Sequence, residues 1–144
     1  MRPNLGFYVQ TINDIVTDTE KIGEEMNPSY EKLRTALDEN KLDSLSSEEL
    51  KEISTLFETG TDKYRAMSKK ISTLRPPAAV MGIHKKFERS YLNYVAGCEE
   101  MLNSINTADG IDKAAFDAAE EKQDTATDEI AFAIQRMTNL LLKK

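Results

Sequence analysis

The sequence predicts an all-α protein, a single domain over residues 1–144 that folds as an antiparallel up-down-up-down four-helix bundle. Three observations lead to this fold class. Apolar residues recur at alternating steps of three and four along four long segments, a spacing that keeps one stripe of a helix against a partner. No segment alternates every second residue, as a half-buried strand would. Glycine (6 residues) and proline (4 residues) are also too scarce for a turn-rich β fold.

The first helix is expected over residues 5–37. Its apolar stripe continues in register across Asn27-Pro28, although a proline inside a helix removes a backbone hydrogen bond and bends the axis. We therefore expect one long helix with a kink near Pro28 rather than two helices that meet at a corner. The predicted stripe consists of Leu5, Val9, Ile12, Val16, Thr19, Gly23, Met26, Tyr30, Leu33 and Leu37.

The second helix, with a stripe over residues 50–74, is expected to begin after a capping box and to end at Pro76-Pro77. In a capping box two side chains, here those of Ser46 and Glu49, each accept a hydrogen bond from the other residue's backbone N–H. Pro76 disfavours helical geometry at the residue before it, and Pro77 fits the first turn of the next helix. The proline pair therefore needs no functional explanation.

The third stripe covers residues 80–105 and the fourth covers residues 116–140, with a Gly110 stop and an Asp112 start between them. The fourth stripe is rich in alanine, so this helix is expected to pack close to its neighbours. The links between the four helices are short, and short links make consecutive helices lie antiparallel.

Composition limits the classes of partner and compartment. The net charge of −6 argues against a general nucleic-acid binder, and we expect no specific nucleic-acid partner. No run of 18 apolar residues occurs, so no transmembrane segment is expected, while peripheral contact with a membrane surface stays open. A single cysteine excludes an internal disulfide and is typical of a reducing compartment such as the cytoplasm, with secretion left open.

No catalytic residue, metal ligand or cofactor is predicted, and we expect no enzyme. A di-iron site of the ferritin type needs two Glu-x-x-His pairs, but the chain has one histidine, His84, with Met81 three residues before it. Cys98 lies about 21 Å farther along the same helix, too far for a shared zinc ion. The stripe predicts a buried, unreactive Cys98 thiol and places His84 at the core edge with a backbone or carboxylate partner. Paired carboxylates such as Glu120-Glu121 are expected on faces turned to solvent.

Tyrosines lie on the predicted stripes and leave two explanations open. Their large rings would fill the space opposite the alanines of the fourth helix, which is the simpler explanation. Because a buried tyrosine hydroxyl needs a hydrogen-bond partner, a polar pocket inside the bundle is the alternative. The residues concerned are Tyr30, Tyr64, Tyr91 and Tyr94, with Tyr8 beside a stripe.

The charge layout is the least ordinary feature. Residues 63–89 hold eight basic residues and one acidic residue, Glu88, in a chain that is acidic overall. The bundle would collect these cations at the end where its second and third helices meet. In the third helix Lys85 and Lys86 come early, against the helix dipole, so either chance or a binding partner explains them. The candidate contacts for an anion or a partner are Lys63, Arg65, Lys69, Lys70, Arg75, Lys85, Lys86 and Arg89.

A second candidate surface is apolar. Phe7, Leu92 and Phe132 fall outside the stripes, and Leu142 closes a segment that is apolar on more than one face. The first and fourth helices are neighbours in the predicted bundle, so Phe7, Phe132 and Leu142 form a candidate apolar interface. The alternative is an irregular core that covers these side chains.

These features support two functional hypotheses. The first is a non-enzymatic interaction module that binds another protein, or itself as a homodimer, through its first and fourth helices. The second is a binder of an anionic ligand, such as an acidic protein, a phosphate polymer or a membrane surface, through the basic segment.

Overall fold

The computed structural model describes residues 5–106 and 110–142, which form a four-helix bundle. No strand occurs among these residues. The elements in chain order are α1 (Leu5–Asp38), η1 (Leu42–Ser44), α2 (Ser47–Thr73), η2 (Ala78–Val80), α3 (Met81–Ile105) and α4 (Lys113–Leu142), where η marks a short 3-10 helix.

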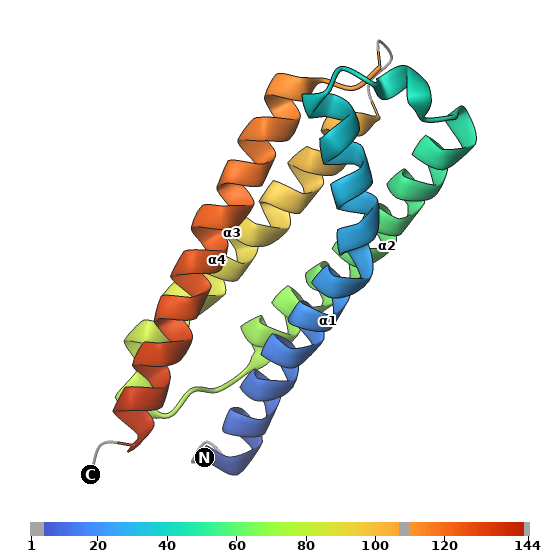
Figure 1. Ribbon diagram of the computed structural model, residues 1–144. Coiled ribbons are helices and arrows are strands. Elements are labelled where there is room, and N and C mark those ends of the chain that lie inside the picture. The colour runs from blue at the N-terminus through green and yellow to red at the C-terminus, as the bar shows by residue number, and fades with distance from the viewer. Residues whose placement is uncertain (1–4, 107–109, 143–144) are drawn as a thin grey trace.

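Figure 1 shows the four long helices side by side, with the chain direction reversing at each connection. The start of α1 and the end of α4 therefore lie at the same end of the bundle as the link from α2 to α3. A contact agrees with this arrangement, because the hydroxyl of Tyr8 in α1 lies 3.7 Å from the sulfur of Met137 in α4. We call this end, which contains Pro76 and Pro77, the proline end.

The helix boundaries follow from local chemistry. Ser46 Oγ accepts a hydrogen bond from the backbone N–H of Glu49 at 3.0 Å, and the Glu49 carboxylate bonds the Ser46 backbone in return, so the predicted capping box is confirmed. Asp112 accepts in the same way from the backbone N–H of Ala115 at 3.0 Å and starts α4. Gly110 before it has a φ of +105°, a region that favours glycine.

Two details at the prolines are settled by the structure. The first helix is one continuous helix through Pro28, as predicted, while the kink at this residue stays a prediction. Pro77 lies at the cap of η2 instead of in the first turn of the third helix, so that prediction is wrong. The extra 3-10 turn, closed by a hydrogen bond from Val80 N to Pro77 O at 3.0 Å, separates the proline from α3.

The predicted stripe of α1 is correct at Ile12 and at its C-terminal part, and wrong at its first two residues. Leu33 is buried, but Leu5 and Val9 are 51% and 37% exposed, while Tyr8 and Ile15 are each only 2% exposed. The cause is helical geometry: a repeat of 3.5 residues drifts about 20° per heptad from a straight helix of 3.6 residues per turn. Over four heptads the drift approaches the 100° between consecutive residues. Ile15 lies five whole turns, 18 residues, before Leu33 and so shares its face.

In α2, α3 and α4 the predicted stripes largely match the buried core, and α4 lies close to α3. A methyl group on Gly97 of α3 would lie only 3.3 Å from the carbonyl oxygen of Ala119 in α4. The small residues of α4 therefore permit the close packing that its alanine content predicts. Buried residues on the three stripes include Ile53, Phe57, Tyr64, Ile71, Phe87, Tyr91, Met101, Phe116, Ala119, Ala126, Ala133 and Met137.

Candidate interaction surface

The three residues of the candidate apolar interface are all exposed. The exposed fractions are 63% for Phe7, 56% for Phe132 and 74% for Leu142, so an irregular core does not cover them. Leu92, at 53%, is exposed as well. Met81, which lies outside the predicted stripe of α3 and was not among the candidate residues, is 48% exposed.

The ring of Phe132 has a basic neighbour. The ammonium nitrogen of Lys86 in α3 lies 5.6 Å from the centroid of this ring in α4, within the range of a cation–π interaction. This contact brings together one residue from each predicted set, the basic and the apolar. Sequence reasoning treated the two sets as separate surfaces, because the pairing of α3 with α4 is not visible in either helix alone.

All eight candidate basic residues are exposed. Arg65 is neutralised, because it lies 2.5 Å from Asp62 and 3.4 Å from Glu99. None of the other seven forms an ion pair within residues 5–106 and 110–142. Their charges are therefore available to an outside group.

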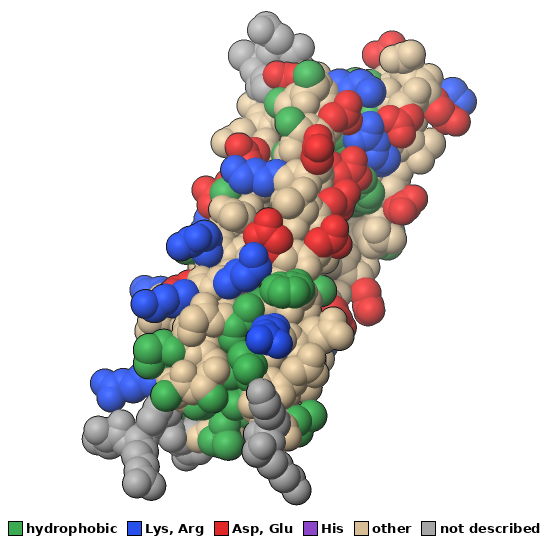
Figure 2. Space-filling view, turned by 90° about the vertical axis from the view of Figure 1, so that its left-hand side faces the viewer, with side chains coloured by type: hydrophobic (Ala, Val, Ile, Leu, Met, Phe, Trp, Pro, Cys, Tyr) green, Lys and Arg blue, Asp and Glu red, His purple; other side chains and the backbone are tan. Residues whose placement is uncertain are grey.

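Figure 2 shows the face of the bundle that α3 and α4 form. Hydrophobic side chains gather in its lower half, toward the proline end, with Lys and Arg side chains around them. Asp and Glu side chains concentrate in the upper half, toward the opposite end. The surface at the proline end is therefore both basic and apolar.

Beneath this surface His84 is buried and hydrogen-bonded. Its Nδ1 lies 2.7 Å from the hydroxyl of Tyr8, and its ring also bonds the backbone of Ile71. The bond to the Ile71 backbone favours the protonated ring, so the ring N–H is the donor in that bond. In the neutral ring, Nδ1 therefore accepts a hydrogen bond from the Tyr8 hydroxyl. Burial is the largest influence and lowers the pKa of His84, against a smaller opposing effect from Glu88. A backbone partner was predicted, but the second partner is a tyrosine, not a carboxylate.

Tyrosine hydroxyls in the core are paired as well. The hydroxyl of Tyr91 lies 2.8 Å from that of Thr19, and the hydroxyl of Tyr94 lies 3.3 Å from that of Tyr64. Cys98 is buried, and this burial raises the pKa of its thiol to about 12. The thiol therefore stays protonated at neutral pH, and a thiol is a much weaker nucleophile than a thiolate.

An ion-pair network at the end opposite the prolines joins α1 to α4. The guanidinium of Arg34 in α1 lies 2.7 Å from Asp117 and 3.1 Å from Glu120, both in α4, and it also binds Asp38. These contacts hold the pKa of Asp38 and of Asp117 below the usual range. The prediction that Glu120-Glu121 faces solvent is therefore wrong for Glu120. No local sequence signal marks the pairs of Arg34 with Asp117 and Glu120, since these residues lie far apart in the chain, whereas Arg34 and Asp38 are four residues apart on α1.

Within the described ranges no three or more His, Cys, Asp or Glu side chains are grouped to hold a metal ion, and no helix has the length and hydrophobicity to cross a membrane. Comparisons with protein-family models, curated proteins and solved structures give no match.

Proposed function

We propose that the protein is a non-enzymatic interaction module that uses its proline end to bind an acidic protein segment with an apolar face. The observation that carries the proposal is the exposed Phe132 ring beneath the Lys86 ammonium group. An apolar ring in a basic surround suits a partner that brings both apolar side chains and carboxylates.

Charge favours an acidic partner over a second copy of this chain. A two-fold dimer interface uses the same patch on both subunits. At the proline end such a dimer would place the unpaired cations of α2 and α3, among them Lys69, Lys70, Lys85 and Lys86, near their own copies. Like charges facing each other across an interface oppose association. Self-association through α1 and α4 is therefore the weaker form of the proposal.

A direct test uses a synthetic helical peptide with leucine at positions i, i+3, i+4 and i+7 and glutamate elsewhere. We expect the protein to bind it, and to bind more weakly as salt rises, because salt screens exposed charges. A peptide with lysine in place of glutamate should not bind. Equal affinity for both peptides would contradict the proposal.

Two variants locate the surface. Lys86→Glu should weaken peptide binding about tenfold or more, since it replaces an attraction by a repulsion. Lys51→Glu is the matched control, because Lys51 is an exposed lysine on the half of α2 away from the proline end. Phe132→Ser should also weaken binding. If all three proteins bind alike, the proline end is not the binding surface.

Anionic vesicles test the membrane alternative, since a basic surface with exposed apolar side chains also suits anionic lipid. The protein is tested for co-sedimentation with phosphatidylserine vesicles. If it co-sediments, if Lys86→Glu abolishes this, and if the protein does not bind the peptide, then the partner is a membrane surface and not a protein. Sedimentation of the free protein tests the dimer. A stable dimer disrupted by Phe132→Ser would favour self-association.

A further inference from the structure

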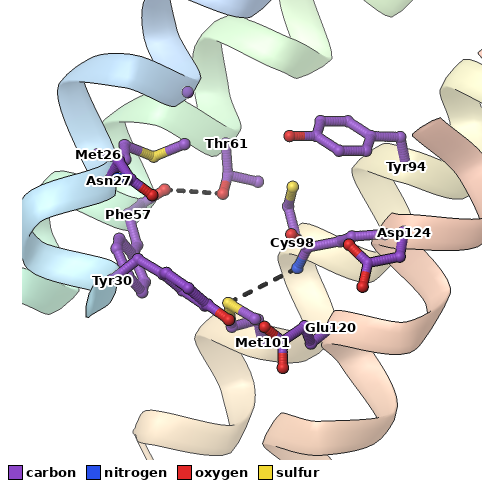
Figure 3. Close-up of a pocket in the computed structure, with 12 residues that line it drawn as sticks. Met26, Asn27, Tyr30, Phe57, Thr61, Tyr94, Cys98, Met101, Glu120 and Asp124 are labelled. Carbon is purple, nitrogen blue, oxygen red and sulfur yellow. Dashed lines mark hydrogen bonds between the residues drawn. The ribbon is translucent and has the colours of Figure 1, made fainter. Parts of the chain in front are cut away.

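A cavity of about 220 Å³ lies between all four helices, away from the proline end. Figure 3 shows that its labelled side chains face a common space, with α1, α2, α3 and α4 each contributing to the wall. Aromatic rings come from three of these helices, namely Tyr30 in α1, Phe57 in α2 and Tyr94 in α3. Pockets between the helices of a bundle are a common place for a small ligand.

The wall of this cavity is acidic on one side. Glu120 and Asp124, one turn apart on α4, both line it, and its lining includes no lysine, arginine or histidine. The nearby Arg34 bonds Glu120 from outside the lining, but Asp38 and Asp117 share that guanidinium. Within the described part of the chain Asp124 has no ion-pair partner. A negative charge therefore remains unneutralised at the cavity.

This combination of rings and carboxylates suits one class of ligand. A cation is attracted both by the faces of aromatic rings and by carboxylates, whereas an anion would be repelled by Glu120 and Asp124. A metal ion would need several closely grouped ligands, and no such group occurs in the described residues. We propose that the cavity binds a small organic cation with an apolar body, whose ammonium group lies at Glu120 and Asp124 and whose apolar part lies among Tyr30, Phe57 and Tyr94.

Size and electrostatics agree with this assignment. An apolar cavity of about 150 Å³ holds benzene, so a cavity of about 220 Å³ admits one ring with a short aminoalkyl chain. Burial and the neighbouring Asp124 raise the pKa of Glu120, which means that its charge is poorly compensated. A bound cation would offset that cost.

The probe for the test is phenethylammonium, with 3-phenylpropanoate as an anion and 3-phenylpropanol as a neutral compound of similar shape. Methionine methyl groups give the readout by NMR, because Met26 and Met101 line the cavity while the exposed Met81 lies at the proline end. We expect only the cation to bind tightly and to shift the signals of Met26 and Met101. Equal binding of all three compounds, no binding, or a shift of Met81 alone would overturn the proposal.

Two matched pairs of variants complete the test. Asp124→Asn should weaken the binding of phenethylammonium about fivefold, the effect of one partly exposed ion pair, whereas Asp128→Asn, one turn farther along α4, should not. Gly23 lines the cavity, and a Cβ placed there meets only the Tyr64 hydroxyl, at 3.7 Å. Gly23→Leu should therefore fill the space and abolish binding in a folded protein. Gly82→Leu, in open space at the start of α3, should bind as the unaltered protein does. Unchanged binding in Asp124→Asn and Gly23→Leu would show that the cavity is not the site.

Discussion

The hydroxyl of Tyr8 lies 2.7 Å from Nδ1 of His84, and this buried pair links the first turns of α1 and α3 at the proline end. Removing the hydroxyl in Tyr8→Phe leaves a buried ring nitrogen without its partner. Such an unpaired group costs about 1–3 kcal/mol, so the free energy of unfolding in urea should fall by that amount. A loss below about 0.5 kcal/mol would show that the bond adds little.

Acid should destabilise the protein through the same histidine. The pKa of His84 is lower in the folded protein than its ordinary value of 6.5, so the unfolded chain takes up a proton first as the pH falls. The contribution of neutral His84 to the free energy of unfolding is therefore fully present above about pH 6.5. It decreases below that pH, until His84 is protonated in the folded protein as well. Urea unfolding between pH 7.5 and 5 measures this loss.

The control for this pH dependence is His84→Gln, which lacks the titrating group. Its stability should change less across the same interval. Glu88, the nearby carboxylate that favours the protonated ring, reduces the effect, so Glu88→Gln should make it larger. Identical pH profiles for the unaltered protein and His84→Gln would contradict the prediction.

Two glycines inside helices should respond in opposite ways to alanine. Gly97→Ala should destabilise the protein by about 1–3 kcal/mol, because its methyl group would lie 2.8 Å from the side chain of Gln123 and 3.3 Å from the backbone oxygen of Ala119. Gly23→Ala should stabilise it by up to about 1 kcal/mol through helix propensity, since a methyl group there makes only an ordinary contact, 3.7 Å from the Tyr64 hydroxyl. Thermal unfolding separates the two outcomes, and a Gly97→Ala variant as stable as the unaltered protein would contradict the packing described for α3 and α4.

The capping box at the start of α2 gives a local test. Ser46→Ala should cost about 1 kcal/mol of unfolding free energy, because the N–H of Glu49 loses its acceptor. The neighbouring Ser47→Ala should change stability little, since no side-chain cap hydrogen bond of α2 involves Ser47. If the two variants lose equal stability, the cap is not the cause.

Arg34 should make stability depend on salt. Arg34→Met removes the ion pairs that join α1 to Asp117 and Glu120 of α4 while keeping the apolar stem of the side chain. The variant should be less stable than the unaltered protein at low salt, and the difference should shrink near 1 M salt, where charges are screened within about 3 Å. A difference that salt does not change would assign the effect to packing.

The local signals in the sequence predicted the elements well. These signals are the capping box at Ser46, the helix start at Asp112 and the three-four spacing of apolar residues. Each depends on residues that lie within one or two helical turns of each other. The prediction of the buried face failed in the longest helix, α1, because a small error in the period of the stripe accumulates along the helix. The stripe of α1 is correct at Leu33 and wrong at Leu5, because a heptad repeat and a straight helix separate by about 20° per heptad.

The candidate surfaces were predicted as separate sets, and their exposure agrees with the sequence analysis. Phe132 falls outside its stripe, so its exposure follows from helical periodicity, whereas a core that covers Phe7, Phe132 and Leu142 stayed an alternative that their exposed fractions exclude. The position of Lys86 above the Phe132 ring does not follow from periodicity, since it depends on how α3 lies against α4. The sequence predicted a polar pocket at the tyrosines only as an alternative to space-filling rings. It did not predict that one wall of the cavity is acidic.

The sequence by itself determined four amphipathic helices, their ends and the separation of charge along the chain, because these depend on contacts between near neighbours. Only the tertiary structure decided which residues from different helices meet, such as Tyr8 with His84 and Arg34 with Glu120. The physical reason is that a helix pattern fixes which face is buried but not the rotation and axial shift of one helix against another. Those are set by side-chain packing over the whole bundle.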